Sequence, residues 1–175
     1  FMTLENVASV GNSNAGIELN SLSDLVINNC KADGNKLGMR AGTAADLANM
    51  TISNSSFNGN SSQGWFVAAQ STPGLSTFTN VTVTNCTFND NPMKGIYVEK
   101  LENAVFDGIT VNNSGVDPAY DNNAGIDINL KYGTYQNIQI LNSTITGCGA
   151  TGIATDITNP SAVAIKARND GSYAA

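Results

Sequence analysis

The sequence contains no histidine, few charged residues and no long apolar run. Charged residues make up 13% of the 175 residues, and 14 Asp and Glu against eight Lys and Arg give a net charge of −6. Binding to nucleic acid takes clustered basic side chains, so this balance argues against a nucleic-acid partner. No apolar run approaches the length of a transmembrane helix, and we therefore expect no membrane span.

Cysteine is also scarce, with Cys30, Cys86 and Cys148 as the three examples. Their spacing fits no zinc motif, and the lack of histidine argues further against zinc. Cys30 and Cys86 take the same place in repeats two apart, about 9.6 Å by strand spacing, which is too far for a disulfide. We expect buried free thiols.

A repeated pattern fills the chain instead. Six short segments begin with glycine, and in most of them apolar residues then flank one more variable residue. The glycines are spaced by 22, 26, 31, 30 and 27 residues, and the segments are residues 16–19, 38–41, 64–67, 95–98, 125–128 and 152–155. Self-similarity at such a period predicts a solenoid. We expect a single domain over residues 1–175, and a fragment of a longer solenoid, because the first residues begin in mid-pattern and the last ones lack a polar cap.

A second strand and a turn follow within each repeat. Apolar residues alternate with polar ones in segments 25–27, 50–52, 81–83, 109–111 and 138–140, which indicates strands with one buried face. Two residues after each segment comes an asparagine, at Asn29, Asn54, Asn85, Asn113 and Asn142. Asparagine tolerates a left-handed bend, and stacked amides can exchange hydrogen bonds, so we predict an interior asparagine ladder. A third short strand follows.

This pattern resembles the right-handed parallel β-helix of the pectate-lyase-like superfamily, over about residues 14–157. The resemblance implies an all-β, single-stranded parallel β-helix with three short strands per coil and about six coils. A leucine-rich repeat is the main rival, but its asparagine lies three residues past the strand and its repeats keep a constant length. Members of the superfamily include polysaccharide lyases, glycoside hydrolases, epimerases and non-enzymatic surface proteins, so the fold alone does not select a function.

Alternation places one row of side chains on the outside of the glycine-led strands, because the apolar neighbours must point inward. The row reads Glu18, Arg40, Phe66, Tyr97, Asp127 and Ala154, and a second row reads Asn20, Gly42, Ala68, Glu99, Asn129 and Asp156. Aromatic rings, carboxylates and an arginine suit a polysaccharide groove, in which Arg can grip a uronate carboxylate. We predict substrate binding by Glu18, Arg40, Phe66, Tyr97, Glu99 and Asp127.

Three chemistries stay open for this row. A lyase or an epimerase needs a base beside a uronate carboxylate, for which Arg40 and Lys94 are candidates, with Arg40 the better placed. An inverting hydrolase needs two separated carboxyls, for which Glu99 and Asp127 are candidates. The chain has no histidine and lacks the recognised motifs of polygalacturonases and alginate epimerases, so Arg40, Glu99 and Asp127 stand as catalytic candidates without an assigned reaction.

Calcium is the one cofactor that these residues suggest; otherwise we expect none. The calcium candidates are Asp117, Asp121, Asp127 and Asp156, since carboxylates are the ligands that Ca²⁺ prefers. Each row residue also has a simpler interpretation: Phe66 and Tyr97 can stack to stabilise the sheet, and Glu18 and Arg40 can form an exposed ion pair. Trp65 points inward by parity and is expected in the core.

Two functions therefore stand side by side. The first is an extracellular or cell-surface β-helix that recognises, or also processes, a polysaccharide, with a uronate-containing polymer as the finer expectation. The second is a non-catalytic solenoid that acts as an adhesin, spike or spacer. Ice binding by stacked Thr51, Thr82 and Thr110 is a weaker third alternative, because Val26 and Gln139 interrupt that row.

Overall fold

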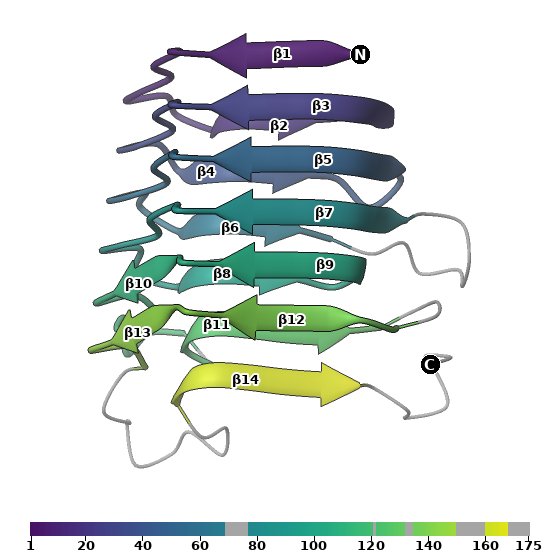
Figure 1. Cartoon of the computed structure of the whole chain (residues 1–175). Coiled ribbons are helices and arrows are strands. Elements are labelled where there is room, and N and C mark those ends of the chain that lie inside the picture. The colour runs from purple at the N-terminus through teal and green to yellow at the C-terminus, as the bar shows by residue number, and fades with distance from the viewer. Residues whose placement is uncertain (69–76, 121, 132–134, 150–159, 168–175) are drawn as a thin grey trace.

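The computed structural model describes residues 1–68, 77–120, 122–131, 135–149 and 160–167 as a parallel β-helix (Figure 1). Two six-stranded sheets face each other. The first, called the opposite sheet below, consists of β1 (Met2–Glu5), β3 (Leu22–Asn28), β5 (Leu47–Ser53), β7 (Phe78–Thr84), β9 (Glu102–Asp107) and β12 (Ile138–Leu141). The other, the glycine sheet, consists of β2 (Ala15–Leu19), β4 (Leu37–Ala41), β6 (Gln63–Val67), β8 (Lys94–Val98), β11 (Ala124–Leu130) and β14 (Ser161–Ala167). Within the described ranges, no helix is long and apolar enough to cross a membrane.

A third parallel pairing occurs in successive coils, where a third short strand was predicted, but it forms strands only in the last two of them. Isolated parallel bridges link Ala8, Lys31, Ser56, Thr87 and Thr110 from coil to coil. In the last two coils the bridges lengthen into β10 (Thr110–Asn112) and β13 (Thr144–Thr146). All pairings are parallel, since each strand stacks on its counterpart one coil away.

Glycine is the second residue of five strands of the glycine sheet, β2, β4, β6, β8 and β11, because the neighbouring coil leaves no room there for a Cβ atom. A Cβ added at Gly38 would lie 2.5 Å from the carbonyl oxygen of Gly64. Gly42, by contrast, has nothing within 4 Å of such an atom. The repeated glycines of the sequence therefore mark the places where one coil packs directly on the backbone of the next.

The core is a column of apolar side chains between the two large sheets. Trp65 is 0% exposed, as its parity predicted, and its ring meets Phe57 and Phe88 edge-on at centroid distances of 5.5 and 5.3 Å. Phe57 and Phe88, on adjacent coils, stack at 5.2 Å. Such aromatic stacking along the axis joins successive coils into one continuous core.

All three cysteines are free, and Cys30 and Cys86 are buried, as predicted. Burial raises the pKa of the Cys86 thiol to about 11, because a thiolate would lose its hydration there. These two thiols act as small apolar residues of the core.

The predicted asparagine ladder was placed at the wrong turn. Asn29, Asn54, Asn85, Asn113 and Asn142 do have left-handed backbones, with φ between 47° and 51°, but their side chains are exposed. The buried asparagines lie one turn later, just before the glycine-led strands. The Oδ1 atom of Asn60 accepts a bond from the Asn35 amide at 3.0 Å, and Asn91 Oδ1 accepts one from the Asn60 amide at 3.0 Å. The left-handed backbone and the buried side chain, which the prediction combined in one asparagine per coil, thus belong to two different asparagines.

Two register predictions are also corrected. Residues 109–111 were expected on the opposite sheet, but β7 pairs with β9, and Thr110 instead belongs to the third short strand. The row of threonines is therefore broken, because Thr82 pairs with Val105 and Thr110 with Thr144. The expected strand at 152–155 lies outside the described residues, and the strand that pairs with β11 is β14. Ala164 and Lys166 consequently take the places predicted for Ala154 and Asp156.

Candidate functional site

The outward row of the glycine sheet is confirmed over five coils. Parallel pairing aligns Glu18 with Arg40, Arg40 with Phe66, Phe66 with Tyr97, and Tyr97 with Asp127. Glu18 is exposed, the next three are half-buried and Asp127 is buried. The row therefore runs from an open surface near β2 into a sheltered region near β11.

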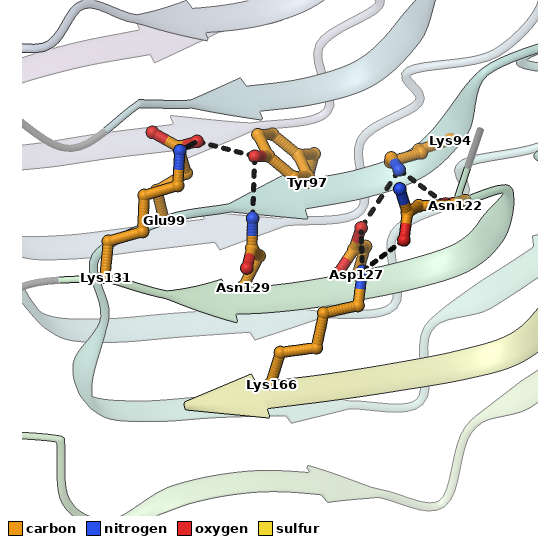
Figure 2. Close-up of polar contacts among 8 residues, drawn as sticks. All are labelled: Lys94, Tyr97, Glu99, Asn122, Asp127, Asn129, Lys131 and Lys166. Atoms are coloured by element: carbon orange, nitrogen blue, oxygen red, sulfur yellow. Dashed lines mark hydrogen bonds and ion pairs between the residues drawn. The ribbon is translucent and has the colours of Figure 1, made fainter. Parts of the chain in front are cut away.

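Asp127 is the centre of the sheltered region (Figure 2). Its Oδ2 atom lies 2.9 Å from Nζ of Lys94 on β8 and 3.2 Å from Nζ of Lys166 on β14. Lys94 also donates to the carbonyl oxygen of Asn122 at 2.6 Å. The three charged side chains come from three successive strands of one sheet, so the fold itself brings them together.

These charges are held away from water. Asp127 is 1% and Lys94 6% exposed, whereas 35% of the Lys166 side chain remains accessible. Burial lowers the pKa of Lys94, and the facing Asp127 carboxylate opposes that shift. Two ammonium groups share one carboxylate oxygen, so this spot carries excess positive charge in a chain of net charge −6. Such an excess attracts anionic ligands.

A second polar network adjoins the first. The Tyr97 hydroxyl donates to Oε1 of Glu99 at 2.5 Å and accepts a bond from the Asn129 amide at 3.0 Å (Figure 2). Lys131 forms an ion pair with Glu99. Burial, together with the bond to Glu99, raises the pKa of Tyr97 above its usual range, so the phenol keeps its proton. The Glu99 carboxylate is thus paired with Tyr97 and Lys131.

An aromatic surface separates this region from the open end of the row. Phe66 and Tyr97 stack at a centroid distance of 5.7 Å with 17° between their planes, as the cross-strand interpretation predicted. The ammonium of Lys94 lies 5.2 Å from the Tyr97 ring centre. The stack therefore supports the sheet and also fixes Tyr97 beside the charged cluster.

The surface is hollowed above these residues. A cavity of about 660 Å³, called the Asp127 hollow below, is lined by Gln63, Phe66, Met93, Lys94, Tyr97, Asn122, Asp127, Asn129 and Lys166. Two acceptors of its lining residues, Oδ1 of Asp127 and Oδ1 of Asn129, are buried and have no hydrogen-bond partner within the described part of the chain. Buried acceptors are normally satisfied, so a ligand that donates hydrogen bonds would be stabilised here.

Several predicted residues lie apart from this hollow. Arg40 forms an ion pair with Glu18 at 2.5 Å, as the simpler interpretation held, and neither residue lines the hollow. Glu99 contacts its rim through Tyr97. Arg40 was expected to be the better placed of the two candidate bases, but Lys94 is the one of the two that contacts Asp127.

The two calcium candidates that the structure describes, Asp117 and Asp127, have other partners. Asp121 and Asp156 lie outside the described residues, and Asp127 faces two lysines, whose charge opposes a cation. The Oδ1 atom of Asp117 accepts a bond from the Ala119 amide at 2.9 Å within a turn. Over the residues that the structure describes, no group of three metal-binding side chains was found.

Sequence reasoning missed Lys166, Asn122, Gln63 and Met93 as lining residues. Lys166 was missed because its strand was expected ten residues earlier. The alternation of Val163, Ala164, Ile165 and Lys166 is the signal that would have found it, since it matches the inward and outward pattern of β11.

Comparison with known proteins supports the architecture. The A-module of the mannuronan C-5 epimerase AlgE4 from Azotobacter vinelandii is similar in structure, with a TM-score of 0.53 and 18% identity. The similarity covers 83% of this chain and 36% of that one, so this chain spans about a third of the epimerase module. At this identity the likeness shows the fold alone.

Sequence comparisons complete this picture. No curated protein matches the chain. A family model for a right handed beta helix region matches residues 74–167, which is more than half of the chain. The strands and their parallel pairing agree with it. The chain belongs to the right-handed β-helix family.

Proposed function

We propose that this protein binds an acidic, uronate-containing polysaccharide in the Asp127 hollow. The observation that carries the proposal is the convergence of Lys94 and Lys166 on one carboxylate, which leaves positive charge in excess beside an aromatic surface. A uronate carboxylate would bind at the accessible Lys166 ammonium, and sugar hydroxyls would donate to the unpartnered oxygens of Asp127 and Asn129. The structural likeness to a mannuronan epimerase supports a polysaccharide as the ligand class.

The proposal places the protein outside the cell or at its surface, where such polymers occur. Its location is tested by fractionating the native organism and probing the secreted, surface and internal fractions with an antibody against this chain. Detection only in the internal fraction would contradict this part of the proposal.

Binding is tested by titrating polymannuronate and polygalacturonate into the protein in a calorimeter, with carboxyl-reduced polymers as neutral controls. We expect binding of at least one acidic polymer, no binding of its reduced form, and weakening by salt. Lys166→Gln should weaken binding about tenfold, because one charge-assisted hydrogen bond is lost. Lys31→Gln, on the exposed third face, serves as the matched control. No binding of any acidic polymer by the folded protein would favour the non-catalytic solenoid.

A second candidate function is proton abstraction from the bound sugar. Lys94 lines the hollow, and burial lowers its pKa, so its amine gives up its proton more readily than that of an exposed lysine. In the neutral form this amine can accept a proton from the carbon beside a uronate carboxylate, while the carboxylate itself binds at the Lys166 ammonium. An absorbance increase from unsaturated products would identify elimination, and proton exchange with deuterated water seen by NMR would identify epimerisation. Lys94→Met should abolish either signal; persistence of the signal in that variant would contradict the role.

A further inference from the structure

We propose that a second hollow, beside the first, is a distal subsite that holds further units of the same acidic polymer; the inference rests on the proposed function. This cavity of about 500 Å³, the Tyr120 hollow, is lined by residues that include Asn12, Lys36, Ser61, Ser62, Met93 and Tyr120. Met93 lines both hollows, so the two are adjacent across one side chain. Together they form a longer binding surface than the Asp127 hollow alone.

The floor of the Tyr120 hollow is held by backbone hydrogen bonds between coils. Its residues belong to the turns that precede the glycine-led strands, where backbone hydrogen bonds run from coil to coil. The Ser61 amide donates to the Asn35 carbonyl at 2.8 Å, and the Met93 amide donates to the Ser62 carbonyl at 2.9 Å. The buried Asn35 and Asn91 belong to the same turns and hydrogen-bond to Asn60 on the inner side: the Asn35 amide donates to Asn60 Oδ1, and Asn91 Oδ1 accepts from the Asn60 amide. A floor fixed in this way loses little conformational entropy when a ligand binds.

Tyr120 forms an aromatic wall of the hollow. Its loop is held by Asp117, which accepts the Ala119 amide through Oδ1 and the Asn123 side chain through its carbonyl oxygen at 2.6 Å. Asn123 is 2% exposed and anchors this loop to the body of the molecule. Tyr120 itself remains 42% exposed. A large aromatic residue on a braced loop suits stacking against a sugar ring.

The polar lining indicates the class of ligand. Hydroxyl and amide groups of Ser61, Ser62 and Asn12 can exchange hydrogen bonds with sugar hydroxyls. Lys36 is exposed, and among the described lining residues it is the charged one, so the hollow is cationic. An acidic sugar is therefore favoured over a neutral or basic one, in agreement with the charge of the adjacent Asp127 hollow.

The test compares short and long ligands. A disaccharide and an octasaccharide of the uronan that binds wild-type protein are titrated into wild type, Lys166→Gln, Tyr120→Ala, Tyr120→Phe and Lys36→Gln. The disaccharide is long enough to fill only the Asp127 hollow, whereas the octasaccharide extends into the Tyr120 hollow as well. Tyr120→Ala should therefore weaken octasaccharide binding about fivefold and leave disaccharide binding unchanged. Tyr120→Phe keeps the ring and should bind as wild type does. Lys36→Gln should reduce the salt dependence of octasaccharide binding alone.

The outcomes separate this inference from the proposed function. If Lys166→Gln weakens both ligands while Tyr120→Ala and Lys36→Gln change neither, the distal subsite is wrong and the Asp127 hollow stands. Equal weakening of both ligands by Tyr120→Ala would also overturn the subsite. If neither ligand nor the polymer binds, the proposed function fails and the inference fails with it. Circular dichroism of each variant confirms that it is folded.

Discussion

The outer faces of the two large sheets carry different side chains on the same backbone plan. On the opposite sheet the outward row is Val26, Thr51, Thr82, Val105 and Gln139, all uncharged, with Thr51 and Thr82 open to solvent. On the glycine sheet the corresponding row contains Asp127, which is 1% exposed and lies between lysines of the two neighbouring strands. Burying charge costs free energy that an uncharged row avoids. The contrast identifies the glycine sheet as the face shaped by a requirement other than stability.

The largest expected effect is the loss of the buried counter-charge. Asp127→Asn keeps the shape of the side chain but leaves Lys94 buried without a carboxylate, so we expect a loss of about 4 kcal/mol in the free energy of unfolding. Thr82→Ala on the opposite sheet should change it by less than about 0.5 kcal/mol. Urea unfolding of both variants measures the difference, and equal values would remove the distinction between the faces.

The next effect concerns the close packing of coils within the glycine sheet. Gly64→Ala would place a methyl group against the backbone carbonyl of Gly95, which cannot move aside without shifting a coil. We expect a destabilisation of about 3 kcal/mol. Gly42→Ala meets no atom within 4 Å and provides the matched control, with a change close to zero. Thermal unfolding of the pair is sufficient, and a stable Gly64→Ala protein would contradict the packing argument.

A smaller difference should separate the two kinds of asparagine. Asn60→Gly removes a buried amide that bonds to Asn35 and Asn91, at an expected cost of about 2 kcal/mol. Asn54→Gly keeps the left-handed backbone and loses only an exposed contact to Asn28, so it should be nearly neutral. Chemical unfolding again measures both, and the reverse order would restore the ladder to the turn at Asn54.

The smallest expected effect at neutral pH, which grows only above about pH 8, is a pH dependence of stability at the edge between the sheets. Lys100 is 2% exposed and donates to the carbonyl oxygens of Thr43 and Ala45; burial lowers its pKa to about 8. The unfolded chain therefore holds this proton to higher pH than the folded protein does, so stability rises between about pH 8 and pH 10.5, by at most about 1.4 kcal/mol per pH unit. Lys100→Met should flatten that rise; an unchanged slope would exclude Lys100 as its source.

Much of the fold could be predicted because its rules are local and repeated. Glycines recur where coils touch, apolar residues alternate along each strand, and asparagines recur at one bend. The outward row from Glu18 to Asp127 follows from alternation and was found correctly. The turns were harder, because asparagine suits both an exposed left-handed bend and a buried ladder, and sequence alone does not say which of two nearby asparagines is buried.

The site was only partly predictable, because it depends on the lengths of intervening loops. Asp127 and Tyr97 were found from their strands, whereas Lys166 comes from a strand reached after a long connection. The register of that strand places Lys166 beside Asn129, from where its ammonium reaches Asp127. The segment 152–155 has an equally suitable sequence pattern, so the register could not be chosen from the sequence. The ion pair between Arg40 and Glu18 shows the converse problem, since two residues suited to binding sugar satisfy each other.

The most direct test of the central claim is a crystal structure of the protein with a bound uronan oligosaccharide. The proposed function predicts a sugar carboxylate within about 3 Å of the Lys166 ammonium, with a hydroxyl donating to Asp127 or Asn129. A well-ordered oligosaccharide bound elsewhere, with the Asp127 hollow free of sugar, would contradict the claim.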